Sequence, residues 1–157
     1  MTPTFRTAIR EDVPLIYQMI CDLALYENLL NEVVCDEATL EDWLFERHRA
    51  EVIFAMVEDK EVGFALFFHN FSTFLGRSGL YLEDLYVRPD YRHQGIGTAM
   101  FKELARIALA RECGRMEWWC LDWNQASINF YKGLGAEAME DWTVYRLSGD
   151  TLHRLAE

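Results

Sequence analysis

The stretch Leu80–Glu112, LYLEDLYVRPDYRHQGIGTAMFKELARIALARE, decides the fold of this chain. Its first part, Leu80–Val87, is mostly apolar and ends at a proline turn, which is typical of a buried strand. From Met100 onward apolar residues recur at steps of three and four, with charged residues on the opposite face. That spacing indicates a helix of about four turns. The stretch therefore predicts a strand, a turn that contains glycine, and a helix.

The glycine turn has the features of an anion site. The first amides of a helix lack internal partners and lie at the positive end of its dipole. Gly95 and Gly97 let a phosphate approach the backbone closely, and Arg92 adds positive charge. The alternative is that the glycines only tighten the turn, because short glycine motifs match many unrelated chains. The sequence has no GxxxxGKS/T run, and Met100 replaces the third glycine of a GxGxxG fingerprint, so neither nucleotide motif is present.

A second segment, Leu121–Ala136, reads LDWNQASINFYKGLGA. Together with the R-x-x-G-x-G turn, it resembles the GNAT superfamily of N-acetyltransferases, whose later strand-helix unit ends in N-x-x-A/S-x-x-F-Y-x-x-x-G. With Leu82–Val87 included, the chain is most similar to the diamine/polyamine (spermidine/spermine) acetyltransferase branch. The resemblance runs from Phe5 to the last helix. It implies an α+β fold with a central mixed, mostly antiparallel sheet that is flanked by helices and splayed at its central strands.

Length and composition set the class of protein. A chain of 157 residues with 51% hydrophobic side chains suits a single domain, 1–157. No apolar run is long enough to span a bilayer, and the first residues lack the layout of a signal peptide, so we expect a soluble cytoplasmic protein. The four cysteines form no CxxC pair and the four histidines are scattered, so we expect no metal.

Charge is distributed unevenly along the chain. Residues 1–61 hold 14 acidic and 5 basic side chains, whereas residues 85–115 hold six basic and three acidic ones. A basic patch around the glycine turn suits a polyanionic cofactor, and an acidic N-terminal third suits a cationic substrate. The alternative is that the acidic excess serves solubility. The overall net charge of −11 disfavours the binding of a phosphate backbone, so we expect no nucleic-acid partner.

The remaining elements follow from local patterns. Asp12 is expected to cap a first helix with Pro14 in its first turn, and Asp36 or Glu37 to begin a second helix. Asn124 is expected to cap a short helix at 126–131. We expect further strands at 4–9, 52–57, 62–68, 116–121 and 142–147, a turn at 59–61, a loop at 69–79 and a closing helical turn at 151–155.

Acetyl transfer from a thioester to an amine needs a bound thioester, a base for the ammonium and an acid for the departing thiolate. The resemblance implies that the splayed strand offers backbone amides to the pantetheine arm, although an ordinary core strand is the alternative. The cofactor-binding residues that it implies are Leu85, Tyr86, Val87, Arg92, His93, Gln94, Gly95, Ile96, Gly97, Thr98, Asn124 and Ser127. The implied cosubstrate is acetyl-CoA.

Glu83 and Asp84 interrupt an apolar strand, where carboxylates are costly unless they are paired or functional. Adjacent strand residues point to opposite faces, so we expect only one of them to face a given pocket. By resemblance, Glu83 faces the acceptor and deprotonates it, and Asp84 serves structure or holds a distal ammonium. A carboxylate satisfied by backbone or by an arginine is the alternative. Tyr131 matches the tyrosine that protonates the thiolate in many GNAT enzymes, with a core anchor as the alternative.

Tyr26 and Glu27 match a Tyr-Glu pair that contributes to the acceptor pocket in the polyamine enzymes, and an exposed acidic loop is the alternative. Those enzymes tend to carry an acidic residue and a tryptophan before the central strand, where this chain has Ser72 and Phe74. One carboxylate fewer makes a shorter diamine or a lysine-like amine such as thialysine competitive with a polyamine.

The function expected is therefore direct acetyl transfer from acetyl-CoA to a primary amine of a small cationic acceptor in a ternary complex. The alternatives are a non-catalytic acyl-CoA-binding regulatory domain, or an acetyltransferase acting on a protein amine or an aminoglycoside-like antibiotic. The resemblance also implies a homodimer, and the sequence leaves open whether the aromatic tail Trp142–Tyr145 forms core or interface.

Overall fold

A five-stranded sheet with the order β1-β2-β3-β4-β5 organises the first part of the chain. The computed structural model describes residues 2–157, which divide into one unit that ends at Trp119 and another from Cys120 to Glu157. The strands are β1 Thr4–Thr7, β2 Glu51–Val57, β3 Lys60–Ser72, β4 Arg77–Val87 and β5 Met116–Trp118. The first four strands pair antiparallel and β5 pairs parallel to β4, so the expected mixed, mostly antiparallel sheet is confirmed.

The sheet opens between β4 and β5. β5 pairs only with Leu80, Tyr81 and Leu82. In the pairing described for residues 2–157, β4 continues from Glu83 to Val87 with β3 on one side and no strand on the other. Backbone amides and carbonyls on that open side lack a ladder partner, and the expected splay of the sheet is confirmed.

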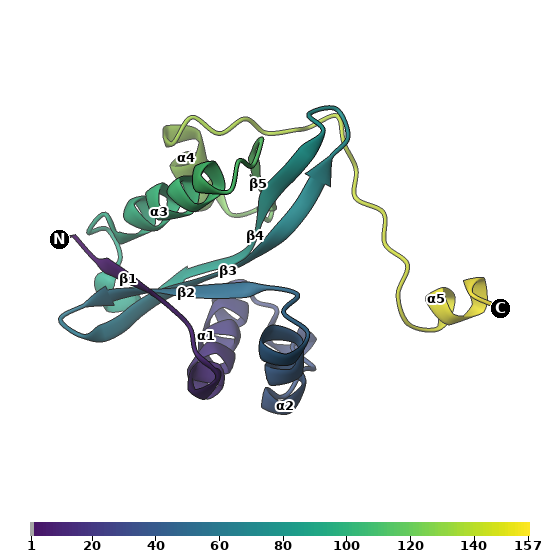
Figure 1. The fold of residues 1–157 in the computed structure, drawn as a ribbon, viewed down its shortest axis with the longest axis horizontal. Helices are drawn as coiled ribbons and strands as arrows, with labels where there is room; N and C mark the ends of the chain where they lie inside the picture. Colours follow the sequence, from purple (N-terminus) through teal and green to yellow (C-terminus); the bar gives the residue numbers. More distant parts are fainter. Residues whose placement is uncertain (1) are drawn as a thin grey trace. The chain divides into compact units, whose positions relative to one another are not determined.

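Helices cover both faces of this sheet. α1 (Val13–Tyr26) and α2 (Glu37–Glu41) lie on one side, and α3 (Ile96–Ala110) lies on the other (Figure 1). A π-helical turn, Asp42–Glu46, continues α2. The core on the α1 side joins Ile16 and Met19 to Phe54, Phe64 and Leu66, all buried. On the other side α3 buries Met100, Phe101 and Leu104.

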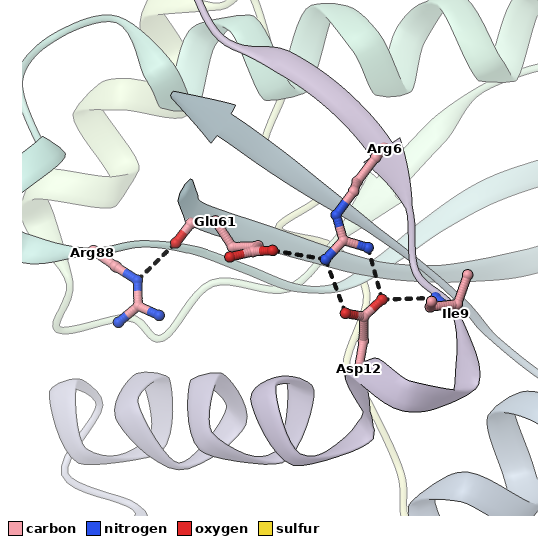
Figure 2. Close-up of polar contacts among 5 residues, drawn as sticks. All are labelled: Arg6, Ile9, Asp12, Glu61 and Arg88. Atoms are coloured by element: carbon pink, nitrogen blue, oxygen red, sulfur yellow. Dashed lines mark hydrogen bonds and ion pairs between the residues drawn. The ribbon is translucent and has the colours of Figure 1, made fainter. Parts of the chain in front are cut away.

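An arginine network ties the strand ends on the α1 side together (Figure 2). The Arg6 guanidinium donates to both carboxylate oxygens of Asp12, at 2.7 and 2.9 Å, and to Glu61 at 2.8 Å. Asp12 is the N-cap residue of α1 and Pro14 lies in its first turn, as expected, but the Asp12 side chain makes no cap hydrogen bond to the helix and accepts from the Ile9 amide instead. The charge-assisted bonds to Arg6 hold the pKa of Asp12 below its usual range. Arg88 donates from Nε to the Glu61 carbonyl oxygen at 2.8 Å, which fastens the end of β4 to the start of β3.

The hairpins are longer and tighter than the sequence suggested. Val57 pairs with Lys60, so the first turn is the two-residue loop Glu58-Asp59, not 59–61. Both loop residues have positive φ, 49° and 63°, as a type I′ turn requires. The expected loop at 69–79 was also too long, because β3 runs to Ser72 and β4 begins at Arg77.

The second unit contains α4 (Gln125–Gly133) and α5 (Gly149–Leu155), with no strand among its residues 120–157. The strand expected at 142–147 was therefore wrong. The segment has apolar and β-branched residues, but a strand needs a hydrogen-bonding neighbour, and the structure pairs it with none in the described chain. Trp142, Tyr145 and Leu147 remain exposed there, at 74%, 92% and 51%. Across residues 2–157, no helix has the length and apolar character that crossing a bilayer requires.

Candidate active site

A β-bulge at Glu83 shapes the middle of β4. Leu66 lies opposite Asp84 and Phe67 lies opposite Leu82, so Glu83 is an extra residue without a partner on β3. Opposite residues of paired strands share a face. Leu82 therefore lies on the same face of the sheet as Phe67. Asp84 lies on the same face as Leu66, which is the face toward the α1 core. A regular strand would have put Leu82 and Asp84 on the same face, so the bulge delivers Asp84 to the α1 side.

Two other carboxylates, Glu27 and Glu83, lie close enough to Asp84 for their charges to act on it. Burial, together with the smaller effects of the negative charges of Glu83 and Glu27, raises the pKa of Asp84 to about 7. Glu27 follows the last residue of α1, and burial raises the pKa of its carboxyl as well. Glu83 is exposed, and its charge also acts on Tyr81, whose pKa rises to about 12 mainly through burial. The expectation that only one of Glu83 and Asp84 faces a given pocket relied on regular alternation, which the bulge interrupts at Glu83.

The glycine turn has the conformation of an anion cradle. Gly95 has a φ of 83° and precedes α3 as its N-cap residue. The Ala99 amide donates to the Gly95 carbonyl oxygen at 3.0 Å as the first bond of the helix. The amides of Ile96, Gly97 and Thr98 therefore have no partner within the helix and lie at the positive end of its dipole. No atom lies within 4 Å of the position that a Cβ at Gly95 would take, so there is open space against the turn. These features fit the diphosphate of a coenzyme A thioester.

The Arg92 side chain follows a different course from the amides. Its Nε donates to the carbonyl oxygen of Val87, the last residue of β4, at 2.9 Å. Its guanidinium carbon lies 5.1 Å from the ring centre of Tyr26 and 5.4 Å from that of Tyr86. These rings and Arg92 line a cavity of about 460 Å³ together with Asp22, Leu25 and Arg88.

The second unit holds the other three predicted residues. The Asn124 side-chain oxygen accepts from the Ser127 amide at 3.2 Å, which confirms that Asn124 caps α4. Asn124 is buried, whereas Ser127 and Tyr131 are half-buried on α4. Their positions within α4 place Ser127 and Tyr131 four residues apart, on one face of that helix.

Among residues 2–157 no cluster of three or more His, Cys, Asp or Glu side chains is arranged to hold a metal ion. The other predicted residues lie in the first unit, at the end of α1, on β4, and in the glycine turn and the start of α3: Tyr26, Glu27, Glu83, Asp84, Leu85, Tyr86, Val87, Arg92, His93, Gln94, Gly95, Ile96, Gly97 and Thr98.

Residues 17–136 match the family profile of the acetyltransferase (GNAT) family. The chain belongs to this family. It is 38% identical to a thialysine N-epsilon-acetyltransferase of Mus musculus, over 96% of this chain and 95% of the relative. It is also 34% identical to a spermidine/spermine N(1)-acetyltransferase-like protein 1 of Homo sapiens, over 96% of this chain and 23% of that much longer protein.

Both relatives lie in the polyamine acetyltransferase branch, as the sequence motifs predicted. Among solved structures, an integron cassette protein from the mobile metagenome of V. cholerae matches with a TM-score of 0.82 and 28% identity, over 100% of this chain and 99% of that one. The protein is thus a GNAT-family N-acetyltransferase with the GNAT fold.

Sequence reasoning missed two parts of this site. The stacking of Arg92 between two tyrosines was missed because Arg92 was assigned to the anion site by its charge alone. The bulge was missed because the Leu82–Val87 segment contains no glycine or proline that marks one. A signal was present nonetheless: two adjacent carboxylates in an apolar strand fit poorly with strict alternation.

Proposed function

We propose that residues 1–157 act as one acetyl-CoA-dependent N-acetyltransferase domain whose acceptor is the primary amine of a small cation: a diamine, a polyamine or a lysine-like amine. The observation that carries this proposal is the concentration of negative charge at Asp84, which faces the α1 side of the open strand β4 and is acted on by the charges of Glu27 and Glu83. A concentration of negative charge attracts a cationic acceptor. The open side of β4 and the bare amides of α3 provide polar groups for the acyl donor.

The residues that would hold the cofactor are those of the open strand, the glycine turn and the first turn of α4. Leu85, Tyr86 and Val87 would offer backbone groups to the pantetheine arm, and the backbone of residues 92–98 would enclose the diphosphate. Asn124 and Ser127, in the second unit, are proposed for the same arm by the resemblance to the GNAT family alone. When bound, acetyl-CoA supplies the acetyl group as a thioester.

The chain's carboxylates would remove the proton of the acceptor ammonium. Glu83 is the proposed base, acting directly or through water, and Asp84 would bind a cationic group of the acceptor. The pKa of Asp84, raised to about 7, also suits proton exchange near neutral pH. Once the nitrogen–carbon bond forms, the nitrogen would lose its second proton to solvent and the carbon–sulfur bond would break. Tyr131 would donate its hydroxyl proton to the thiolate and regain a proton from solvent. The products are the N-acetyl amine and the free thiol.

A lysine-like acceptor has the strongest support among the candidate amines. The relative with 38% identity is a thialysine acetyltransferase. Ser72 is buried, and its hydroxyl accepts from the Leu75 amide, so this position contributes a turn and no charge. Phe74 is 94% exposed. The loop therefore adds no carboxylate for a second or third ammonium of a long polyamine.

We also infer a homodimer in the cytoplasm. The apolar side chains that the C-terminal segment exposes support the dimer: Met139, Trp142, Val144, Tyr145, Leu147, Leu152 and Leu155. An uncovered apolar set of this kind marks a surface for a partner.

The test is release of coenzyme A thiol from acetyl-CoA against putrescine, spermidine, ornithine, thialysine and an aminoglycoside. We expect thiol release that depends on the amine. Release should saturate at a lower concentration of a lysine-like amine than of the other amines. Release with the aminoglycoside alone would support an antibiotic acceptor instead. Tight binding of coenzyme A without release by any amine would favour a non-catalytic acyl-CoA-binding domain.

A further inference from the structure

The Arg92 side chain has three contacts: a backbone carbonyl of β4 and the rings of Tyr26 and Tyr86 on the α1 side. Its Nε is bonded to the last carbonyl of β4, which closes the connection from residue 88 to residue 92. Its guanidinium lies over the rings of Tyr86 and Tyr26. Tyr86 is buried in the sheet, whereas Tyr26 is the last residue of α1 and is 41% exposed. The guanidinium thus joins a rigid ring to a ring at the free end of a helix.

These contacts depend on the shape of the guanidinium and not on charge alone. A planar guanidinium stacks on aromatic faces and keeps an N–H in a fixed direction, whereas a lysine ammonium is a compact, strongly hydrated charge. Arg88 lines the same cavity, but its Nε bonds the Glu61 carbonyl, and no stacking on either tyrosine is described for it. Of these two arginines, Arg92 is the one whose side chain links the start of the glycine turn to α1.

We propose that Arg92 is a positioning residue that holds the end of α1 against β4, and through Tyr26 sets the place of Glu27 beside Asp84. The proposal rests on the proposed function, because it assumes that Glu27 belongs to the acceptor pocket. It adds that Arg92, before the glycine turn, keeps Glu27 in place. Glu27 directly follows Tyr26, and its charge already acts on the Asp84 carboxyl. Loosening Tyr26 would shift one of the three carboxylates that attract the amine, while the amides of α3 keep their geometry.

Kinetics separates this role from direct neutralisation of a diphosphate by Arg92. If Arg92 is a positioning residue, Arg92→Lys and Arg92→Gln both raise the KM for the amine about fivefold, as expected for lost stacking on two rings. Both variants keep the affinity for coenzyme A in calorimetry within about twofold. If its charge binds the diphosphate, Arg92→Lys behaves like the wild type and Arg92→Gln weakens coenzyme A binding alone. That second pattern would overturn the proposal.

A double-mutant cycle with Tyr26→Leu tests the proposed path. Because both substitutions break the same contact, the KM of the double variant should not exceed that of the worse single variant. Independent, multiplying effects would contradict the path through Tyr26. Arg106→Lys is the matched control, since Arg106 is exposed on α3 and pairs only with Glu103 among the ion pairs described. It should leave both constants unchanged.

Hydrogen exchange of the free protein provides a readout that does not need activity. The Glu27 amide donates to the Leu23 carbonyl and the Leu29 amide to the Ala24 carbonyl, so both report on the end of α1. In Arg92→Lys these amides should exchange faster than in Arg106→Lys, while the amides in the middle of α3 stay protected. Unchanged exchange at the end of α1 would refute the role of Arg92. A wild-type protein that releases no thiol with any amine would refute the proposed function and leave this test in force.

Discussion

Asp84 is a carboxyl held in surroundings that oppose its ionisation, and its proposed role in binding the amine would account for that cost in stability. The bulge at Glu83 directs it to the α1 side, where burial and two neighbouring carboxylates raise its pKa to about 7. A carboxyl in such surroundings resists ionisation, yet a cationic amine would compensate its charge on binding. The residue-scale predictions follow from this shifted pKa and from Tyr131.

The dependence of activity on pH should report Asp84. If the ionised carboxylate binds the amine, kcat/KM for the amine should fall as the pH drops below about 7, because the protonated form then dominates. In Asp84→Asn, kcat/KM at pH 8 should fall at least about tenfold, as for a lost charge-assisted contact. The acid limb in rate profiles from pH 5 to 9 should lose its inflection near 7. An inflection that persists in Asp84→Asn would assign it to another group.

The free energy of unfolding should depend on pH in the opposite direction to activity, and should fall as the pH rises. In the unfolded chain the Asp84 carboxyl has the ordinary aspartate pKa of 3.8, whereas in the folded protein its pKa is about 7, so the folded state binds more protons between these values. Stability contributed by the protonated form is therefore lost as the pH rises from about 4 to about 7. Asp84→Asn should raise the free energy of unfolding by about 1–2 kcal/mol at pH 8, relative to its effect at pH 4. Urea denaturation at both pH values measures this, and equal effects at the two would contradict the raised pKa.

Tyr131→Phe should lower kcat at least about tenfold while the affinity for coenzyme A stays within about twofold, because only the proton for the thiolate is lost. Stopped-flow thiol detection and calorimetry give the two numbers. Unchanged turnover would leave Tyr131 as an anchor of α4 without a role in proton transfer.

The turn before α3 is the element in which backbone conformation matters most. His93 and Gly95 both have positive φ, 61° and 83°, but only Gly95 can adopt that conformation without strain from a Cβ. Gly95 is the N-cap residue of α3, so this turn leads directly to the first amides of the helix, which have no partner within it. A histidine at such a position is retained at a conformational cost of about 1 kcal/mol.

His93→Gly should therefore stabilise the protein slightly. We expect the free energy of unfolding to rise by up to about 1 kcal/mol, because the left-handed strain disappears and His93 is exposed with no hydrogen bond described for its ring. Coenzyme A affinity should stay within about twofold. The matched control is Gln94→Gly, since Gln94 donates to the Asp90 carbonyl and is not among the residues with positive φ. It should destabilise the turn, and a destabilising His93→Gly would show that the ring supports the turn.

Local signals decided how much of these elements the sequence could predict. Proline and glycine marked the limits of β4 and α3, and Asn124 and Asp36 marked the starts of α4 and α2 correctly. The turn at Glu58-Asp59 was misplaced because neither residue is the Asn or Gly that usually reveals a type I′ turn. The side chain of Asp12 was assigned to a local cap, but Arg6 and the Ile9 amide hold it in the folded chain. Such competition depends on tertiary placement, which no local window contains.

At the scale of the whole molecule, the C-terminal segment is the least expected feature. The alternation of Trp142 to Leu147 predicts a strand, yet a single chain provides no described partner for it and leaves its apolar side chains exposed. An apolar alternating pattern indicates that one face of a segment is buried, but it does not indicate whether the same chain or a partner buries it.

If a second copy covers this segment, charges on it should weaken the dimer. Trp142→Glu with Tyr145→Glu should raise the dimer dissociation constant at least about a hundredfold, because two large aromatic side chains would no longer be buried. Thr143→Glu carries a charge in the same segment without removing an aromatic ring and should have a smaller effect. Sedimentation at several concentrations measures the constants, and a wild-type protein that stays monomeric throughout would contradict the inferred homodimer.

The most direct measurement of the central claim is thiol release from acetyl-CoA by the wild-type protein and by Glu83→Gln, each with saturating thialysine. The account predicts release that requires the amine, with equal amounts of thiol and N-acetyl product. In Glu83→Gln the rate should fall at least about tenfold, with coenzyme A affinity kept within about twofold. Wild-type protein that binds coenzyme A but releases no thiol with thialysine or any other amine of the panel would contradict the account.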